Sequence, residues 1–203
     1  MRLLHTSDWH LGKRLFDKER YDVFEKFLAW LLSTIRQERV DTLIVAGDIF
    51  DTAVPTNKSL RLYYDFLSQL TSSECRHVVI VSGNHDSPTL LEAPKGILEN
   101  FGVHVIGGAE SPEDEVIELK DKAGNLEGVV CAVPFLRERD ILRLKDDSTL
   151  SRAEEIQLAV ENHYKSVVKA AIDRMEPKKF LSLLPVICLR SDLLKEKTLT
   201  SFI

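Results

Sequence analysis

The stretch Thr42–Asp51, which reads TLIVAGDIFD, decides the fold of this 203-residue chain. Its first five residues are mostly β-branched or aliphatic, and an apolar run of this length before a glycine is typical of a strand buried in a parallel sheet. In open α/β sheets, ligands bind beyond the carboxyl ends of such strands. We therefore expect Asp48 and Asp51 to lie at the edge of the sheet where a ligand binds.

Two further apolar stretches, 3–7 and 78–82, also run directly into side chains that can bind metals. These side chains are Asp8, His10, Asn84 and His85. A single Asp or Asn after a strand is usually a turn residue or a helix cap. Three strand ends that all carry carboxylate, imidazole or amide groups instead predict one shared metal site. These ligands suit Mn, Fe, Zn or Mg. They do not form a structural zinc site, because thiolates are missing from the set.

The composition limits the possible function classes. The chain is 44% hydrophobic, so it can bury one good core, and its formal net charge is -5. That charge counts against a pure nucleic-acid-binding module, but an enzyme acting on DNA can handle phosphate with bound cations and a local basic patch. Three scattered cysteines, no apolar run near the ~20 residues of a membrane span, and an N-terminus without a signal peptide predict a cytoplasmic protein away from membranes.

Hydrophobic periodicity predicts helices between the strands. Thr56 is the expected N-cap of one helix, and Thr89 and Ser151 each precede a glutamate by three residues, which is the spacing of a capping box. The alternation of strand and helix implies right-handed crossovers, a parallel sheet and an α/β fold, with the later strands in a second sheet or layer. The expected helices are 18–38, 56–70, 89–100 and 151–175, and the expected later strands are 103–106, 115–119 and 128–133.

Three motifs carry a family resemblance. The sequences Asp8-x-His10, Gly47-Asp48-x-x-Asp51 and 83–86 (GNHD) resemble the first three signatures of the calcineurin-like metallophosphoesterases. The segments around these motifs, HTSDWHLG at 5–12 and VAGDIFDT at 45–52, resemble more specifically the SbcD family of bacterial nuclease subunits. The resemblance extends over residues 1–179. It implies a sandwich of mixed β-sheets flanked by helices.

The same resemblance implies an activity and its partners. It implies a divalent-metal-dependent DNA nuclease, acting as a double-strand exonuclease and as a single-strand or hairpin endonuclease in DNA repair and recombination. The expected partners are DNA, an SbcC-type ATPase subunit and a second copy of the chain in a homodimer. Two alternatives remain open. One is a phosphodiesterase or phosphatase of the same superfamily acting on a small substrate, and the other is a catalytically dead fragment.

The resemblance also assigns roles to individual residues. Two divalent ions, Mn with Mg as the alternative, would be held by Asp8 and His10 on one side and Asn84 on the other, with Asp48 between both. His85 would be the general acid or a phosphate contact, and Asp51 the residue that orients it. Substrate contact by Lys13 and Arg14 is an open alternative to an ordinary solvated surface. We expect Trp9 to pack in the core, Asp86 to cap a helix, and His163 to be a structural residue.

The C-terminal part departs from the resemblance. Members of the SbcD family continue into Gly-His and Gly-His-x-His motifs, whereas here the strand-like Leu184–Ile187 is followed by Cys188–Asp192, and no histidine occurs after His163. We hypothesise that 180–203 is a divergent tail, produced by a frameshift, a truncated gene model or a pseudogene, and that the last strands are missing. Intact Gly-His coding in another frame just downstream would support this. We therefore expect the chain alone to be weakly active or inactive.

Overall fold

Two β-sheets form the centre of the molecule. The computed structural model describes residues 1–109, 111–142, 150–175 and 183–187. The first sheet is parallel, with the strand order β1-β2-β3-β4, and the second has the order β5-β6-β7, with β5 antiparallel and β7 parallel to β6. The strands are β1 (Leu3–Thr6), β2 (Thr42–Ala46), β3 (His77–Val81), β4 (Val103–Ile106), β5 (Val116–Lys120), β6 (Leu126–Val133) and β7 (Leu183–Ile187).

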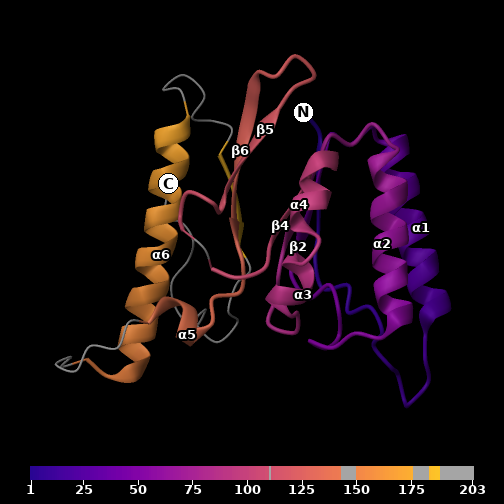
Figure 1. The fold of residues 1–203 in the computed structure, drawn as a ribbon, viewed down its shortest axis with the longest axis horizontal. Helices are drawn as coiled ribbons and strands as arrows, with labels where there is room; N and C mark the ends of the chain where they lie inside the picture. Colours follow the sequence, from indigo (N-terminus) through magenta and orange to yellow (C-terminus); the bar gives the residue numbers. More distant parts are fainter. Residues whose placement is uncertain (110, 143–149, 176–182, 188–203) are drawn as a thin grey trace.

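Helices cover the outer faces of both sheets, so the layers run helix, sheet, sheet, helix (Figure 1). The pair α1 and α2 packs on the first sheet, and the long helix α6 packs on the second. This is the predicted α/β sandwich of mixed sheets flanked by helices, and the prediction is confirmed. The helices are α1 (Tyr21–Gln37), α2 (Asn57–Thr71), α3 (Pro88–Glu92), α4 (Lys95–Leu98), the 3-10 helix η1 (Glu99–Phe101), α5 (Glu138–Ile141) and α6 (Arg152–Arg174).

Strand β2 shows why its sequence is an unbroken apolar run. Every residue of the strand is buried. Leu43 and Val45 contact the core beneath α1 and α2, whereas Ile44 and Ala46 belong to the core between the two sheets. Because successive side chains of a strand point to opposite faces, a strand with a covered layer on each side needs apolar residues at every position.

The helix boundaries correct the predictions in two places. Helix α1 begins at Tyr21 and not near residue 18, because Leu15 and Lys18 exchange backbone hydrogen bonds of 3.1 and 3.0 Å across a tight turn. Thr56 caps α2 as predicted, and its hydroxyl accepts the Ser59 N–H at 3.1 Å. The predicted capping box at Ser151 is confirmed at the start of α6.

The predicted capping box at Thr89 is wrong. Ser87 is the N-cap of α3, Pro88 occupies its first turn, and the helix ends at Glu92. The Glu92 carboxylate does not return to its own helix start but accepts the amides of Gly107 and Gly108 at 2.8 and 2.9 Å, beyond the end of β4. The expected single helix 89–100 is therefore divided into α3, α4 and η1.

The second sheet forms a separate layer, as the strands predicted at 115–119 and 128–133 indicated. Of the predicted tail 180–203, only Leu183–Ile187 lies within the described residues, where it pairs with β6. The hypothesis of a frameshifted tail otherwise concerns residues outside the described part. Among the described residues, no helix combines the length and the apolar character that crossing a membrane requires.

A polar cluster joins the two sheets at the amino ends of the first sheet's strands. Arg76 donates through Nη2 to Asp41 Oδ1 at 2.9 Å and to Glu127 Oε2 at 2.7 Å, and through Nη1 to the Lys120 carbonyl at 2.6 Å. Burial alone would raise the pKa of Asp41, but the Arg2 amide and the Arg76 guanidinium lower it below its usual value. This end of the sheet is opposite to the carboxyl ends, where the predicted metal ligands lie.

Candidate metal centre

The loops after β1 and β2 run side by side beyond the ends of their strands. The Asp8 amide donates to the Gly47 carbonyl at 3.1 Å, and the His10 amide donates to the Asp48 carbonyl at 2.9 Å. A third bond of 3.0 Å, from the Gly47 amide to the Val81 carbonyl, attaches the same loop to β3. The parallel pairing thus continues past the strands, and it places the predicted ligands from distant parts of the sequence next to one another.

Three of the predicted ligands have left-handed backbone conformations. The φ angles of Asp8, His10 and Asp48 are 56°, 46° and 50°. Positive φ is uncommon outside glycine, although Asp, Asn and His adopt it more readily than other residues, and such strained residues cluster at functional sites. The ligand atoms of these three residues lie within 4.8 Å of one another, so the left-handed positions occur where the candidate ligands converge.

Gly83 allows β3 and β2 to approach each other at the site. A Cβ atom at this position would lie 2.0 Å from Asp48 Oδ1 and 2.3 Å from the Asp48 nitrogen, distances that real Cβ atoms do not show. The next residues use this closeness, because the His85 amide donates to Asp48 Oδ1 at 3.0 Å. A glycine before Asn84 is therefore required by the packing of Asp48.

His10 presents its two ring nitrogens to different carboxylates. Nε2 lies 3.9 Å from Asp8 Oδ1 and 3.7 Å from Asp48 Oδ2. Two ligand atoms that are each about 2.1 Å from a shared ion are ~3–4 Å apart, so these three groups can coordinate one divalent ion. Nδ1 lies 3.2 Å from Asp51 Oδ1, although without the alignment of a hydrogen bond. A ligating histidine whose other nitrogen faces a carboxylate is the usual arrangement in metal sites.

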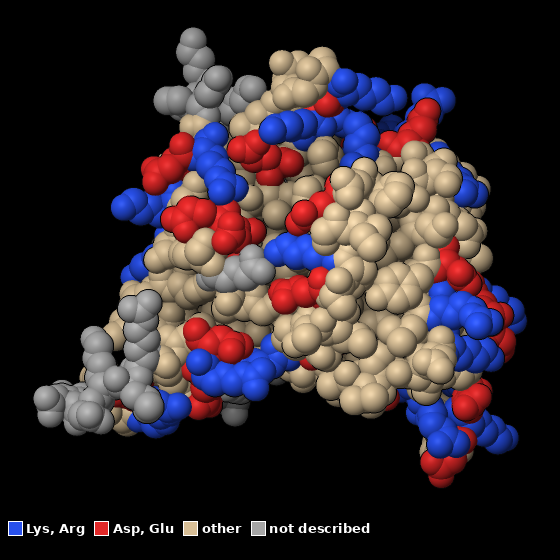
Figure 2. All heavy atoms as spheres, in the orientation of Figure 1, with Lys and Arg blue, Asp and Glu red and all other residues tan. Residues whose placement is uncertain are grey.

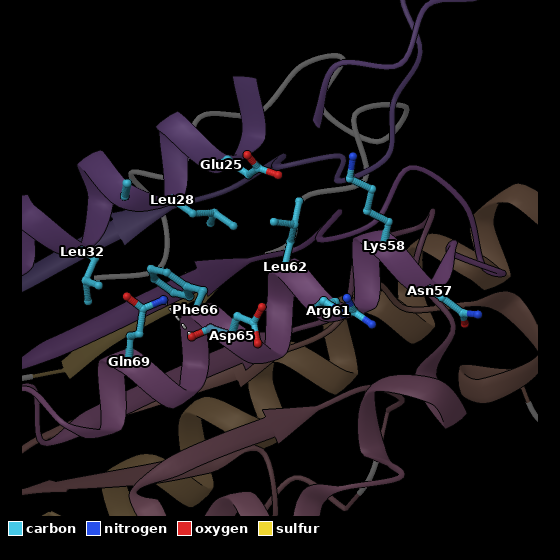
Figure 3. Close-up of a pocket in the computed structure, with 11 residues that line it drawn as sticks. Glu25, Leu28, Leu32, Asn57, Lys58, Arg61, Leu62, Asp65, Phe66 and Gln69 are labelled. Atoms are coloured by element: carbon cyan, nitrogen blue, oxygen red, sulfur yellow. Dashed lines mark hydrogen bonds between the residues drawn. The ribbon is translucent and has the colours of Figure 1, made fainter. Parts of the chain in front are cut away.

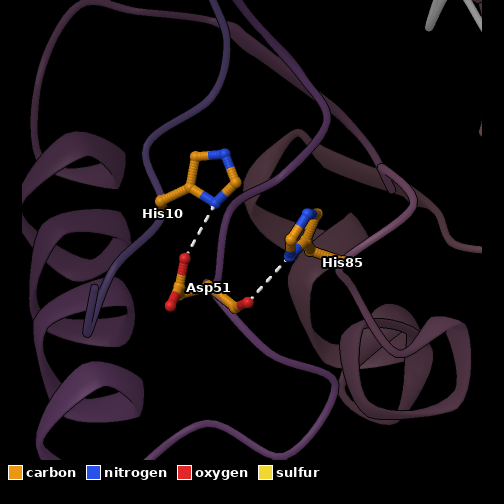
Figure 4. Close-up of side chains that lie close together, drawn as sticks. All are labelled: His10, Asp51 and His85. Atoms are coloured by element: carbon orange, nitrogen blue, oxygen red, sulfur yellow. Dashed lines mark hydrogen bonds and ion pairs between the residues drawn. The ribbon is translucent and has the colours of Figure 1, made fainter. Parts of the chain in front are cut away.

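Asp51 contacts both histidines, but through different oxygens (Figure 4). Its carboxylate faces His10, whereas its backbone carbonyl lies 2.8 Å from His85 Nδ1. The two imidazole rings meet edge to face, with centroids 4.9 Å apart. The expectation that the Asp51 side chain orients His85 is therefore wrong for the carboxylate, because it is the main-chain oxygen of Asp51 that contacts this ring.

Asp86 does not cap a helix. Its buried carboxylate accepts three backbone amides, from Ile49, Phe50 and Gly83, at 3.2, 2.9 and 2.8 Å. Burial raises its pKa, the three amides oppose that shift, and the nearby Asp48 charge adds to it. Asp86 thus fastens the loop after β3 to the loop after β2. The sequence contained the signal for this correction, since Ser87-Pro88 is the pattern of an N-cap followed by proline in the first turn.

The remaining predicted site residues lie at the rim. Asn84 and His85 are exposed at the end of β3. The Lys13 ammonium lies 3.8 Å from Asp51 Oδ1 and stays 60% exposed, whereas the Arg14 guanidinium donates to the Asp17 carbonyl at 2.5 Å. The structure therefore turns Lys13 toward the site, and it occupies Arg14 with a contact within its own loop.

The comparison with known families agrees with this geometry. The family model described as calcineurin-like phosphoesterase matches residues 1–182. The chain belongs to this family. Calcineurin-like phosphoesterases bind divalent metals, and the carboxylate and imidazole groups assembled here suit such ions.

The curated relatives are bacterial nuclease subunits. The chain is 36% identical over 165 residues to the SbcD subunit of the nuclease SbcCD from Escherichia coli (strain K12), which covers 81% of this chain and 40% of that protein. Identity to the SbcD subunit of Rhodobacter capsulatus is 40% over 71% of this chain and 38% of that protein, and to that of Bacillus subtilis 33% over 86% and 42%. The chain spans about two fifths of the length of these relatives.

A solved structure, that of Pseudomonas putida nuclease MPE, is also similar. The match covers 53% of this chain and 48% of that one at 23% identity, with a TM-score of 0.39, which is too low to support a conclusion.

The predicted structural roles of Trp9 and His163 in this phosphoesterase domain are both confirmed. Trp9 lies between the ligands Asp8 and His10 in sequence, yet it is buried and meets the rings of Phe27 and Phe66 edge to face. His163 is far from the site, on α6. Its Nε2 lies 2.8 Å from a carboxylate oxygen of Glu115, which is fully buried.

A groove on the helical side of the domain is separate from the site. It has a volume of about 710 Å³, and Figure 3 shows Leu28 and Leu32 of α1 facing Leu62 and Phe66 of α2. None of the predicted ligands lines this groove. On the face drawn in Figure 2, basic and acidic side chains are interspersed, so this face presents no large basic region of the kind that grips nucleic acid by charge alone.

Proposed function

We propose that this chain supplies the metal-binding part of a DNA nuclease, in which two divalent ions, Mn with Mg as the alternative, assist the hydrolysis of phosphodiester bonds. Asp8 and His10 hold one ion, Asn84 the other, and Asp48 lies between them. The observation that carries the proposal is the convergence of Asp8, His10 and Asp48 within coordination distance of one point. When bound, the ions activate water and offset charge on the phosphate.

Support for DNA as the substrate comes from the relatives, because the proteins that match over most of this chain are named as the SbcD subunit of the nuclease SbcCD. Their name also supports an SbcC-type ATPase as a partner. We infer that the chain acts with this partner in DNA repair and recombination, as a homodimer in the cytoplasm. Cleavage would include double-strand exonuclease and single-strand or hairpin endonuclease activity.

His85 has the surroundings that a general acid needs. A backbone carbonyl can only accept, so the contact between His85 Nδ1 and the Asp51 carbonyl requires a proton on Nδ1. Nε2 is then an acceptor in the neutral ring, and it becomes a donor only when the ring is charged. When the ring carries a proton on Nε2 as well, that proton can pass to the departing sugar oxygen, which is the role of a general acid.

Lys13 is the better candidate for contact with the DNA backbone. Its ammonium reaches the edge of the site and remains 60% exposed, so it can approach a phosphate that lies over the ligands. The Arg14 guanidinium donates to the Asp17 carbonyl, and this bond holds its side chain within its own loop. We propose that Lys13 contributes more to DNA affinity than Arg14.

The test is Mn binding together with cleavage of end-labelled duplex DNA. Asp48→Ala is expected to abolish tight Mn binding and any cleavage, whereas the matched control Asp65→Ala, an exposed aspartate of α2, should leave both unchanged. A version extended with the C-terminal remainder of a relative should cleave faster than the chain alone, which we expect to be weakly active or inactive.

The outcomes separate the candidate functions. Cleavage of small phosphodiesters without cleavage of DNA by either version would favour the small-substrate alternative. Mn binding without any cleavage by the extended version would favour a catalytically dead fragment. A wild-type chain whose Mn affinity equals that of Asp48→Ala would refute the proposed metal site. Robust nuclease activity of the short chain, lost in Asp48→Ala, would instead refute only our expectation of weak activity.

A further inference from the structure

The loop between β6 and α5, residues 134–137, packs against the loop that carries Asn84 and His85. The Phe135 amide donates to the Ser82 carbonyl at 2.9 Å, and the Arg137 guanidinium donates through Nη2 to the Asp86 carbonyl at 2.9 Å. These two bonds grip the loop 82–86 at both of its ends. They come from the segment that follows β6 of the second sheet, whereas Asp8 and Asp48 follow strands of the first.

The loop 82–86 is held on its other side by the first sheet. Asp86 accepts the amides of Ile49 and Phe50, and the His85 amide donates to Asp48. The loop therefore lies between two supports, and Arg137, in the segment after β6, provides a side-chain hydrogen bond to the loop's backbone. Asn84 and His85, at the middle of the loop, are exposed and depend on these end contacts for their position.

The surroundings of Arg137 indicate that its role is more than fold stability. Its Nη1 is shielded from solvent, and the described part of the chain offers it no hydrogen-bond acceptor. The guanidinium carbon lies 5.9 Å from the centre of the Phe135 ring. A buried donor without a partner is unfavourable, and an apolar side chain of the same shape would avoid that penalty. What such a side chain could not supply is the bond to the Asp86 carbonyl.

We propose that Arg137 is a positioning residue of the metal centre, which acts through the Asp86 carbonyl to keep Asn84 and His85 in place against Asp48 and His10. The inference rests on the proposed function, in which Asn84 binds an ion and His85 meets the substrate. Support of this kind around metal ligands typically changes metal affinity or activity 10–100-fold when it is lost. Metal affinity falls in this way when every ligand is present but a loop that carries some of them is not held in place.

Three variants separate positioning from simple stabilisation. Arg137→Met keeps the apolar stem and removes every donor, whereas Arg137→Lys keeps a charged donor that can reach the Asp86 carbonyl. Arg139→Ala is the matched control, because this neighbouring arginine is 77% exposed and forms an ion pair with Asp140, the next residue of the chain. If Arg137→Met does not fold, Arg137→Gln replaces it. The measurements are Mn affinity, the unfolding temperature, and backbone hydrogen exchange in the metal-free chain.

We expect Arg137→Met to bind Mn 10–100-fold more weakly and to exchange the amides of Gly83 and His85 at least 10-fold faster. Exchange in β2 and the unfolding temperature should change little, and Arg137→Lys should recover most of the wild-type behaviour. Unchanged affinity and exchange would overturn the proposal. So would faster exchange throughout β2 with a lower unfolding temperature, since Arg137 would then be merely structural.

The experiment also distinguishes this inference from the proposed function. A wild-type chain that binds no Mn would refute the proposed metal site, whatever the variants do. The exchange of Gly83 and His85 is measured without metal, so it still decides whether Arg137 holds the loop. Wild-type Mn binding with no effect of Arg137→Met would leave the proposed function standing and refute the positioning role.

Discussion

The substitution Gly83→Ala tests the close packing of the site most directly. The added Cβ would fall 2.0 Å from Asp48 Oδ1 and 2.3 Å from the Asp48 nitrogen. Ordinary contact begins near 3.4 Å, so the two backbones must separate by about 1 Å. The Asp48 backbone cannot move freely, because its carbonyl accepts the His10 amide at 2.9 Å. Displacement of Asp48 therefore also displaces His10, a second predicted ligand.

The expected effects are both thermodynamic and functional. Overpacking of this kind costs about 1–3 kcal/mol, which in a domain of this size lowers the unfolding temperature by roughly 2–12 °C. A ligand misplaced by about 1 Å should weaken Mn binding by 10–100-fold. Thermal unfolding of the metal-free chain and titration with Mn measure the two effects separately.

Gly96→Ala is the matched control for this experiment. Gly96 lies in α4, and a Cβ there would meet nothing within 4 Å. Alanine in a helix is favoured over glycine, so this variant should be as stable as the wild type or slightly more stable, with unchanged Mn affinity. If Gly83→Ala kept both the unfolding temperature and the Mn affinity of the wild type, the argument from close packing would be refuted.

Two further predictions concern regions away from the site. His163→Ala removes a 2.8 Å contact from the fully buried Glu115 and should cost about 1–3 kcal/mol in unfolding free energy, seen by denaturant titration, without changing Mn affinity. A loss of Mn affinity there would contradict a purely structural role. The lowered pKa of Asp41 adds stability above the unfolded value of 3.8, and this stability is lost as the pH falls below it. Asp41→Asn should therefore lose less stability than the wild type as the pH falls below 3.8, and an acid-unfolding curve identical to that of the wild type would contradict the contribution of Asp41 ionisation.

The sequence predicted those parts of the fold that follow from local pattern. The buried run 42–46 predicted a strand covered on both faces, and the motifs at 8–10, 47–51 and 83–86 predicted side chains at the same edge of a parallel sheet. Parallel strands in one sheet end on the same side, so a sequence pattern at each end is enough to place the residues together. The metal-binding roles of these residues stay predictions, although the structure brings Asp8, His10 and Asp48 together.

Contacts between distant segments could not be predicted in the same way. The choice of the Asp51 carbonyl and not its carboxylate as the partner of His85 depends on how the loop after β2 is rotated. Similarly, the contact of Arg137 with the Asp86 carbonyl joins positions 51 residues apart, and no periodicity relates them. The wrong N-cap at Thr89 has a different cause. The sequence Ser87-Pro88 indicates the true N-cap, but the prediction relied on the spacing between Thr89 and Glu92.

Backbone strain at the site yields a last prediction. Asp8 has a φ of 56° and an exposed side chain, and its carboxylate lies near that of Asp48. Glycine adopts positive φ without strain, and Asp8→Gly also removes one negative charge from the group. Although glycine gains entropy in the unfolded chain, the metal-free variant should be more stable than the wild type by about 0.5–1 kcal/mol, while its Mn affinity should fall.

Arg39→Gly is the matched control for strain alone. Arg39 follows the C-cap of α1 with a φ of 50°, a position where glycine is the usual residue, and it is exposed and distant from the site. It should gain a similar stability and keep the wild-type Mn affinity. Mn stabilises any chain that binds it in the folded state, so at a fixed Mn concentration it should raise the unfolding temperature of the wild type and of Arg39→Gly more than that of Asp8→Gly. If Mn raised all three equally, Asp8 would not be a ligand, and its conformation would have no connection with metal binding.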